Sequence, residues 1–222
     1  MFYHLVKKFI SRFIPLLLQG NFLFMRNIYL VFIGCLLGIT SCNNSNNTSG
    51  ATQGDNANTQ TKVGKEPVHS KLSDAGTQVL MDVVSKYYSL KNALVATKAA
   101  RADSAATQLA GAADSMMAFL QKDSANIATL KPYMDTILSQ SKAVNAIKDE
   151  TCERQRIVFE TISRNMYALL KAADLKNARI YHQYCPMAFN ERGAYWLSDN
   201  AEIFNPYFGK KMLECGEIAD SL

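Results

Sequence analysis

Residues 153–174, ERQRIVFETISRNMYALLKAAD, carry the strongest periodic signal in the chain. Large apolar residues recur here at steps of three and four, the spacing that places side chains on one face of an α-helix. Glu153 near the start and Lys171 near the end suit the helix dipole. The stripe that we expect to face a core consists of Ile157, Val158, Ile162, Met166, Leu169, Leu170 and Ala173. Such a helix needs partners against which to bury this stripe.

Three earlier segments have the same period and can supply these partners. The first has Ser70 or Ser73 as a candidate N-cap, followed by Leu80, Val83, Val84, Tyr87, Leu90 and Leu94. The second starts after Ala102 and is rich in small residues, which favours close packing. The third begins near Pro132, a residue suited to a first helical turn. Four amphipathic segments with short connections predict a mainly α fold, an up-and-down four-helix bundle over residues 70–175.

The period changes after residue 175, so we expect a different structure in residues 176–222. Two short aromatic-rich runs, at 180–186 and 194–197, flank the sequence NERG at 190–193, which fits the turn of a β-hairpin. This C-terminal tail is predicted to be irregular apart from the hairpin. We expect it to pack on the bundle, because its apolar and aromatic residues need a surface to bury against: Tyr195, Trp196, Ile203, Phe204, Tyr207 and Phe208.

The first 69 residues are predicted to be a targeting segment and a tether. Arg26 precedes a thirteen-residue apolar run, 28–40, and small residues follow, as in a secretory signal over residues 1–41. Met25 is a better start than Met1, so residues 1–24 are expected to be an over-extended start. The ending ITSC at 39–42 resembles the bacterial lipobox, which implies that Cys42 is lipidated. The alternative is an N-terminal transmembrane anchor, for which the run is short. The polar segment 42–69 is predicted to be a disordered tether.

The charge distribution argues against a nucleic-acid-binding protein. The net charge is +5, but four basic residues lie before residue 42, where no acidic residue occurs, and the remainder has 20 basic against 19 acidic residues. No basic face is left to neutralise phosphates. The signal segment and the lipobox-like ending instead predict an exported protein that is held by its lipid on a membrane and faces the periplasm or the cell exterior.

The candidate site residues are gathered in the tail. The stretch YHQYCPM (181–187) and the stretch KMLECG (211–216) together contain His182, Cys185, Met187, Met212 and Cys215. In an extended chain, residues 185 and 187 point to the same side, and in a helical turn residues 212 and 215 do so. Thiolate and thioether ligands suit Cu(I). A mixed set that includes the imidazole would also accept Zn(II), which is the second choice.

Other interpretations of the same residues stay open. Cys185 and Cys215 could instead form a disulfide, which is ordinary in an exported protein and would stabilise the fold. The two methionines fit a core as well as a metal site, and the histidine fits a hydrogen-bonded edge position. Cys152 could be a third thiol of the site or a small buried hydrophobe. In CERQR (152–156), the arginines could lie on a solvated face, or could clamp a carboxylate or organise the tail.

Several segments resemble a bacterial family of helical domains of unknown function. They are YYSLKNALVATKAARADSAATQLA (87–110), ERQRIVFETIS (153–163) and YCPMAFNERGAYWLSDNAEIFNPYFGKKMLECGE (184–217). The resemblance covers residues 70–222. Members of this family occur as exported lipoproteins and appended to periplasmic adaptor subunits of copper and heavy-metal efflux pumps, so the resemblance implies copper or a related ion. CPM also resembles a short heavy-metal-binding motif in which a histidine follows, but Ala188 stands there, so that motif is incomplete.

The sequence contains no catalytic constellation, no phosphate-binding glycine loop and no CxxC pair, so we expect neither an enzyme nor a cofactor site. The leading hypothesis is a lipoprotein that binds a soft metal ion, Cu(I) first, for buffering or for handover to heavy-metal efflux components. The rival hypothesis is a protein-interaction module without metal, whose tail is fixed by a disulfide between Cys185 and Cys215.

Overall fold

The computed structural model describes residues 66–222. The predicted signal segment, the lipidated Cys42 and the tether up to residue 65 lie outside the described residues. Residues 66–69, which the sequence assigns to the tether, lie against residues 176–177. The His69 N–H donates to the Lys176 carbonyl at 3.3 Å, and the Lys176 N–H donates to the His69 carbonyl at 2.9 Å. The folded part therefore includes the last residues of the predicted tether.

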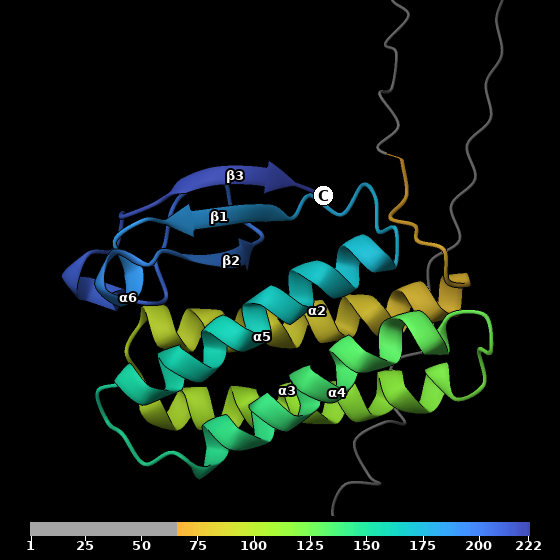
Figure 1. Cartoon of the computed structure of the whole chain (residues 1–222), viewed down its shortest axis with the longest axis horizontal. Coiled ribbons are helices and arrows are strands. Elements are labelled where there is room, and N and C mark those ends of the chain that lie inside the picture. The colour runs from red at the N-terminus through yellow and green to blue at the C-terminus, as the bar shows by residue number, and fades with distance from the viewer. Residues whose placement is uncertain (1–65) are drawn as a thin grey trace, which may run out of the picture. The chain divides into compact units, whose positions relative to one another are not determined.

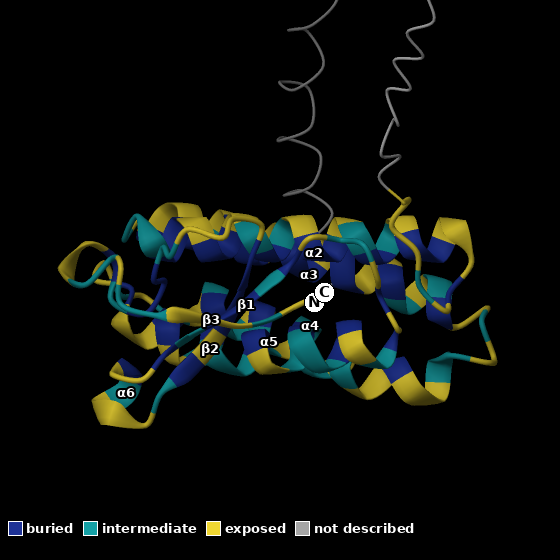
Figure 2. Ribbon diagram, turned by 90° about the horizontal axis from the view of Figure 1, so that it is seen from above, coloured by how far each residue is buried: buried dark blue, intermediate teal, exposed yellow. Residues whose placement is uncertain are grey.

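Four helices form the main body of the described chain, and they confirm the predicted bundle. They are α2 (Asp74–Val95), α3 (Ala99–Leu120), α4 (Ile127–Ala146) and α5 (Glu153–Ala172). Each helix packs on the next, and α5 also contacts α2 (Figure 1). The loops that join them are short, which makes neighbours antiparallel. Their buried faces point inward and their exposed faces outward (Figure 2). Among residues 66–222, no helix has the length and apolar character needed to cross a membrane.

The ends of these helices differ from the sequence prediction at two places. Of the two candidate caps of α2, Ser73 is the N-cap, because its hydroxyl accepts the Gly76 N–H at 3.2 Å. Helix α3 begins at Ala99, earlier than the expected start after Ala102. The expected start of α4 near Pro132 is wrong: the helix begins at Ile127, and the proline lies within it. Pro132 is the sixth residue of the helix and cannot donate to the Ala128 carbonyl, so the helix forms without that hydrogen bond.

The buried face of α5 is also rotated relative to the prediction at its first turn. Ile157 is 57% exposed, whereas Phe159 is fully buried. The buried positions of the helix are Gln155, Arg156, Phe159, Ile162, Ser163, Met166, Leu169 and Leu170. Residue 157 lies off this face because successive helical residues are rotated by about 100°. The prediction for Ile157 was wrong because polar residues 155 and 156 take the buried positions.

The tail forms a three-stranded antiparallel sheet with the order β2-β1-β3. The strands are β1 (Tyr181–Cys185), β2 (Ala194–Ser198) and β3 (Glu217–Ser221). The predicted hairpin corresponds to β1 and β2, with the short helix α6 (Ala188–Glu191) between them. A 3-10 turn, η1 (Gly209–Lys211), precedes β3. The sequence did not predict strand β3. Figure 1 shows the sheet on the α5 and α2 side of the bundle, and β2 packs directly on α5.

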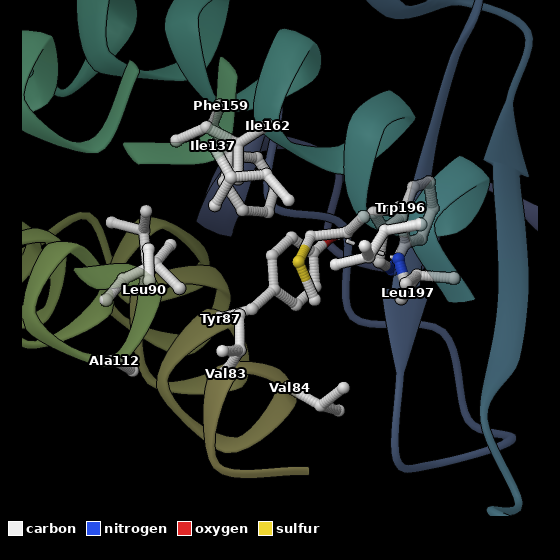
Figure 3. Packing of buried hydrophobic residues seen from close by; sticks show 14 of the residues in the cluster. Val83, Val84, Tyr87, Leu90, Ala112, Ile137, Phe159, Ile162, Trp196 and Leu197 are labelled. Carbon is white, nitrogen blue, oxygen red and sulfur yellow. Dashed lines mark hydrogen bonds between the residues drawn. The ribbon is translucent and has the colours of Figure 1, made fainter. Parts of the chain in front are cut away.

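A buried tyrosine joins the bundle to the sheet. The Tyr87 hydroxyl hydrogen-bonds to the Ser163 hydroxyl at 2.8 Å and accepts the Leu197 N–H at 3.0 Å. Its ring stacks on Phe159 with the centroids 5.2 Å apart. Figure 3 shows this side chain extending from α2 toward Trp196 and Leu197 of β2. Since the hydroxyl is fully buried, these two bonds fix where β2 sits on the helices.

Replacing Tyr87 by phenylalanine should destabilise the protein by about 1–3 kcal/mol, because the buried Leu197 N–H loses its acceptor. Tyr88 provides the matched control: its hydroxyl has no hydrogen-bond partner among the described residues. The change Tyr88→Phe should therefore leave the free energy of unfolding within about 0.5 kcal/mol. Urea unfolding followed by circular dichroism measures both values. Equal effects of the two variants would contradict the assigned role of Tyr87.

Candidate metal centre

Two of the predicted site residues meet in the folded tail. The Cys185 and Cys215 Sγ atoms lie 2.7 Å apart, and both residues are thiols. Cys185 is the last residue of β1 and is fully buried, whereas Cys215 lies just before β3 and is partly exposed. The expected convergence of sulfur atoms thirty residues apart in the sequence therefore holds for the two thiols.

The loop between β2 and β3, residues 199–216, is fixed over one face of the sheet by two buried amides. The Gln183 side-chain N–H₂ group lies 2.9 Å from the Asn200 carbonyl and 3.3 Å from the Glu202 carbonyl. Asn205 donates from its side chain to the Cys215 carbonyl at 2.7 Å, and its side-chain oxygen accepts the Tyr207 N–H at 2.7 Å. Because residues 183 and 185 point to the same face of β1, the loop covers the face on which Cys185 lies.

Gly216 allows the chain to approach β1 and β2 directly after Cys215. A Cβ atom at this position would lie 2.8 Å from the Trp196 ring and 2.8 Å from the Tyr184 carbonyl oxygen. Its φ of 152° also disfavours other residues. The sequence CG at 215–216 is thus explained by packing, because a larger residue would push the second thiol away from the first.

Arg156 ties this loop to the bundle, and it is buried to 94%. Its Nε donates to the Pro206 carbonyl at 2.8 Å, Nη1 to the Thr151 carbonyl at 2.8 Å and Nη2 to the Leu94 carbonyl at 3.0 Å. Of the two interpretations open from the sequence, Arg156 organises the tail, whereas Arg154 lies on the solvated face. Burial lowers the pKa of the guanidinium, but arginine keeps its charge at any physiological pH.

The Cys215 sulfur lies in an environment that favours the protonated thiol. Burial raises the pKa of the Cys215 thiol, and the adjacent Cys185 raises it further by hydrogen bonding and charge. The backbone N–H of Met187 points to the same sulfur and opposes this rise in pKa. At neutral pH the Cys215 sulfur is therefore a thiol, and a metal ion would have to displace its proton.

The two predicted thioether residues contact Cys215 through their backbones, and their side chains line a common cavity. Met187 is 47% exposed at the start of α6, and Met212 lies at the end of η1. Both line a cavity of about 680 Å³, whereas neither cysteine does. The four sulfur-bearing residues thus occupy one corner of the tail, with the methionines toward the cavity.

His182 lies away from the sulfur atoms. It is on β1, three residues before Cys185, so its side chain points to the opposite face of the sheet. The imidazole stacks between the rings of Tyr167, at 3.8 Å between centroids, and Tyr195, at 4.7 Å. Burial lowers the pKa of His182, so the ring is neutral at pH 7. The structure gives this histidine an aromatic stacking role and does not bring it to the thiols.

The third thiol of the described residues belongs to the bundle. Cys152 is fully buried at the N-cap of α5, where it has a left-handed backbone with φ of 62°. Burial raises the pKa of this thiol. Within residues 66–222, no three side chains of the types His, Cys, Asp and Glu come close enough to share one ion. A metal centre here would consist of Cys185, Cys215 and thioether sulfur.

The residues that hold the pair in place were not identified from the sequence. Gln183, Asn205 and Gly216 are the main ones, and all act through tertiary contacts. One signal was present for the first: a glutamine in the middle of an aromatic-rich strand is expected to need buried partners for its amide. For Asn205, the following proline indicates only a turn and not the partners of its side chain.

The helical part of the chain matches a known family. Residues 83–178 match the model of a family described as a protein of unknown function (DUF3347). This region runs from within α2 to just before β1, and it is less than half of the chain. The chain thus contains a helical domain of unknown function that is similar to this family, and the sulfur pair lies beyond the matched residues. No curated protein and no solved structure matches the chain.

Replacing Arg156 by methionine should destabilise the protein by about 2–4 kcal/mol, because the buried Leu94 and Pro206 carbonyls and the part-buried Thr151 carbonyl lose a charged donor. It should also speed alkylation of Cys215 by iodoacetamide well below the unfolding midpoint, because Pro206 is no longer held. The control is Arg154→Met, at a side chain that is 62% exposed, with an expected cost below about 1 kcal/mol. Unchanged alkylation of Cys215 in the first variant would show that Arg156 does not position the loop.

Proposed function

We propose that the chain is an exported lipoprotein whose tail binds one soft metal ion, Cu(I) in the first place, for buffering or for handover to heavy-metal efflux components. The observation that carries this proposal is the 2.7 Å contact between the Cys185 and Cys215 sulfur atoms. Export and the lipid on Cys42 rest on the sequence, since both lie outside the described residues. No catalytic step is part of the proposal.

The donor chemistry supports a soft monovalent ion over zinc. Two thiolates with nearby thioethers are ligands that select Cu(I), which accepts low coordination numbers with sulfur. A zinc centre ordinarily has four ligands drawn from cysteine, histidine and carboxylates. Among the described residues only two such groups meet at the pair. Zn(II) therefore remains the weaker candidate.

Binding requires the two sulfur atoms to move apart. With metal–sulfur bonds of about 2.3 Å, two thiolates on one ion are separated by about 3.8 Å in a tetrahedral arrangement and by about 4.6 Å in a linear one. The thiols are closer than this. The shift of about 1–2 Å can come from rotation of Cys215, which is partly exposed and lies at the end of a loop rather than within a strand.

The same contact supports a second candidate function, a protein-interaction module with a Cys185–Cys215 disulfide. Two thiols in van der Waals overlap need only lose two protons and two electrons to an oxidant to form the bond. In an oxidising compartment that bond would lock residues 199–216 on the sheet and leave the bundle as a docking surface. The two candidates differ in the state of the thiols in the cell.

The metal-binding proposal predicts that reduced, anaerobic protein takes up one Cu(I) per chain in competition with a chromophoric chelator. Changing both Cys185 and Cys215 to serine should abolish this uptake, because the other thiol of residues 66–222, Cys152, belongs to the bundle. Changing Met187 and Met212 to leucine should weaken the affinity by about tenfold, equivalent to about 1.4 kcal/mol. Cys152→Ser is the matched control and should bind as the parent does. Undiminished binding by the double serine variant would refute the site.

The affinity for Cu(I) should rise with pH. The raised pKa of Cys215 keeps this thiol protonated between about pH 6 and 8, and binding releases the proton. Each displaced proton makes the apparent affinity about tenfold higher per pH unit. Competition titrations at several pH values, corrected for protonation of the chelator, measure this slope. A flat profile would mean that Cys215 is not a ligand.

Mass spectrometry after rapid alkylation of cellular protein separates the two candidate functions. Alkylated Cys185 and Cys215, together with copurified copper, are expected for the metal-binding protein. A complete bridge between the two peptides, unaffected by added copper, would instead favour the interaction module.

A further inference from the structure

The cavity beside the thiol pair has the features of a small-molecule site. Its volume of about 680 Å³ lies in the usual range for such sites, roughly 300–1,000 Å³. Much of its wall is apolar or aromatic, and its lining includes Arg156, Ile157, Met187, Phe189, Phe208 and Met212. It lies between the first turn of α5 and the tail, so both parts of the fold contribute to it.

The distinctive feature of the cavity is a buried cation without a partner anion. The Arg156 guanidinium forms no ion pair with any described carboxylate, although the side chain is 94% buried. Four of its five N–H groups donate to neutral oxygens, those of Pro206, Thr151, Leu94 and Thr97. One Nη1 N–H is left without a protein acceptor. A buried charge is ordinarily compensated, so this group favours an anion.

The other charges of the cavity lie at its exposed rim, where one lysine is set against two glutamates. Lys211 and Glu153 form an ion pair at 3.5 Å, and their side chains are 80% and 65% exposed. Glu191 is also exposed. Solvent screens such groups, so they contribute little to the field inside, whereas the buried guanidinium is screened much less. The N-terminus of α5 adds partial positive charge on the same side.

We propose that this cavity binds a small amphipathic monoanion, an aromatic or aliphatic carboxylate. The carboxylate accepts a hydrogen bond from Nη1 of Arg156, and the apolar body lies against Phe189, Phe208 and the two methionines. This site does not depend on the thiols: the chain with Cys185 and Cys215 changed to serine retains it. The two sites share only Met187 and Met212, so loss of Cu(I) binding in the double serine variant leaves the carboxylate site testable.

The test uses 3-phenylpropionate as the probe and 3-phenylpropionamide as its neutral analogue. Protein labelled with ¹³C at the methionine methyl groups is titrated with each compound. The acid is expected to shift the Met187 and Met212 signals and to leave that of Met166, which is buried in the bundle. The amide should bind at least about tenfold more weakly. Equal binding of acid and amide, or no shift of either signal at millimolar acid, would overturn the proposal.

Two matched variants distinguish binding in the cavity from nonspecific binding elsewhere on the protein. Ile157→Trp places a large ring in the cavity from a side chain that is 57% exposed, and it should abolish binding without unfolding the protein. Ile218→Trp, at a side chain 47% exposed on β3 and outside the cavity, should leave binding unchanged. Binding that survives the first variant, or that both variants remove equally, would contradict the assignment of the site.

Discussion

The guanidinium of Arg156 is the contact on which the tail depends. It is a buried positive charge that donates to the carbonyl oxygens of Leu94, Thr151 and Pro206, so it joins the end of α2, the start of α5 and the loop that leads to Cys215. Desolvating this group costs free energy, and only the full set of acceptors offsets that cost. The arginine thus holds the loop through Pro206, because any other loop position would take one acceptor away from a buried charge.

The thiol pair is a product of tertiary structure at several levels. Tyr87 holds β2 on the helices through its hydroxyl, and β2 in turn pairs with β1, whose last residue is Cys185. Asn205 holds the backbone of Cys215 from within the loop. One sulfur therefore comes from a strand and the other from a loop that is fixed independently. The Cys185 side chain is thus held within the strand, whereas the partly exposed Cys215 side chain can rotate on its fixed backbone. Such rotation suits either capture of an ion or closure of a disulfide.

The sequence predicted the helices well, because a 3.6-residue period acts over many residues and tolerates local exceptions. The prediction of the buried face was wrong at the first turn of α5, where Arg156 rather than Ile157 is buried. A buried arginine needs hydrogen-bond acceptors, and these come from segments distant in the sequence. Strand β3 was missed because EIADS is mostly exposed and shows no alternation. His182 was grouped with the sulfur atoms by proximity in sequence, but three residues along a strand reverse the side of the sheet. The approach of Cys185 to Cys215 was a hypothesis from spacing; its cause, the fixed loop, could not be inferred locally.

The central claim is that two thiols brought together by the fold form a sulfur centre for one soft ion. X-ray absorption spectroscopy at the copper edge, on protein loaded with one Cu(I) per chain, tests it most directly because it reports the atoms bound to the metal. We expect the first coordination shell of the bound copper to contain only sulfur. A shell of nitrogen or oxygen, as His69, His182 or carboxylates would give, would contradict it.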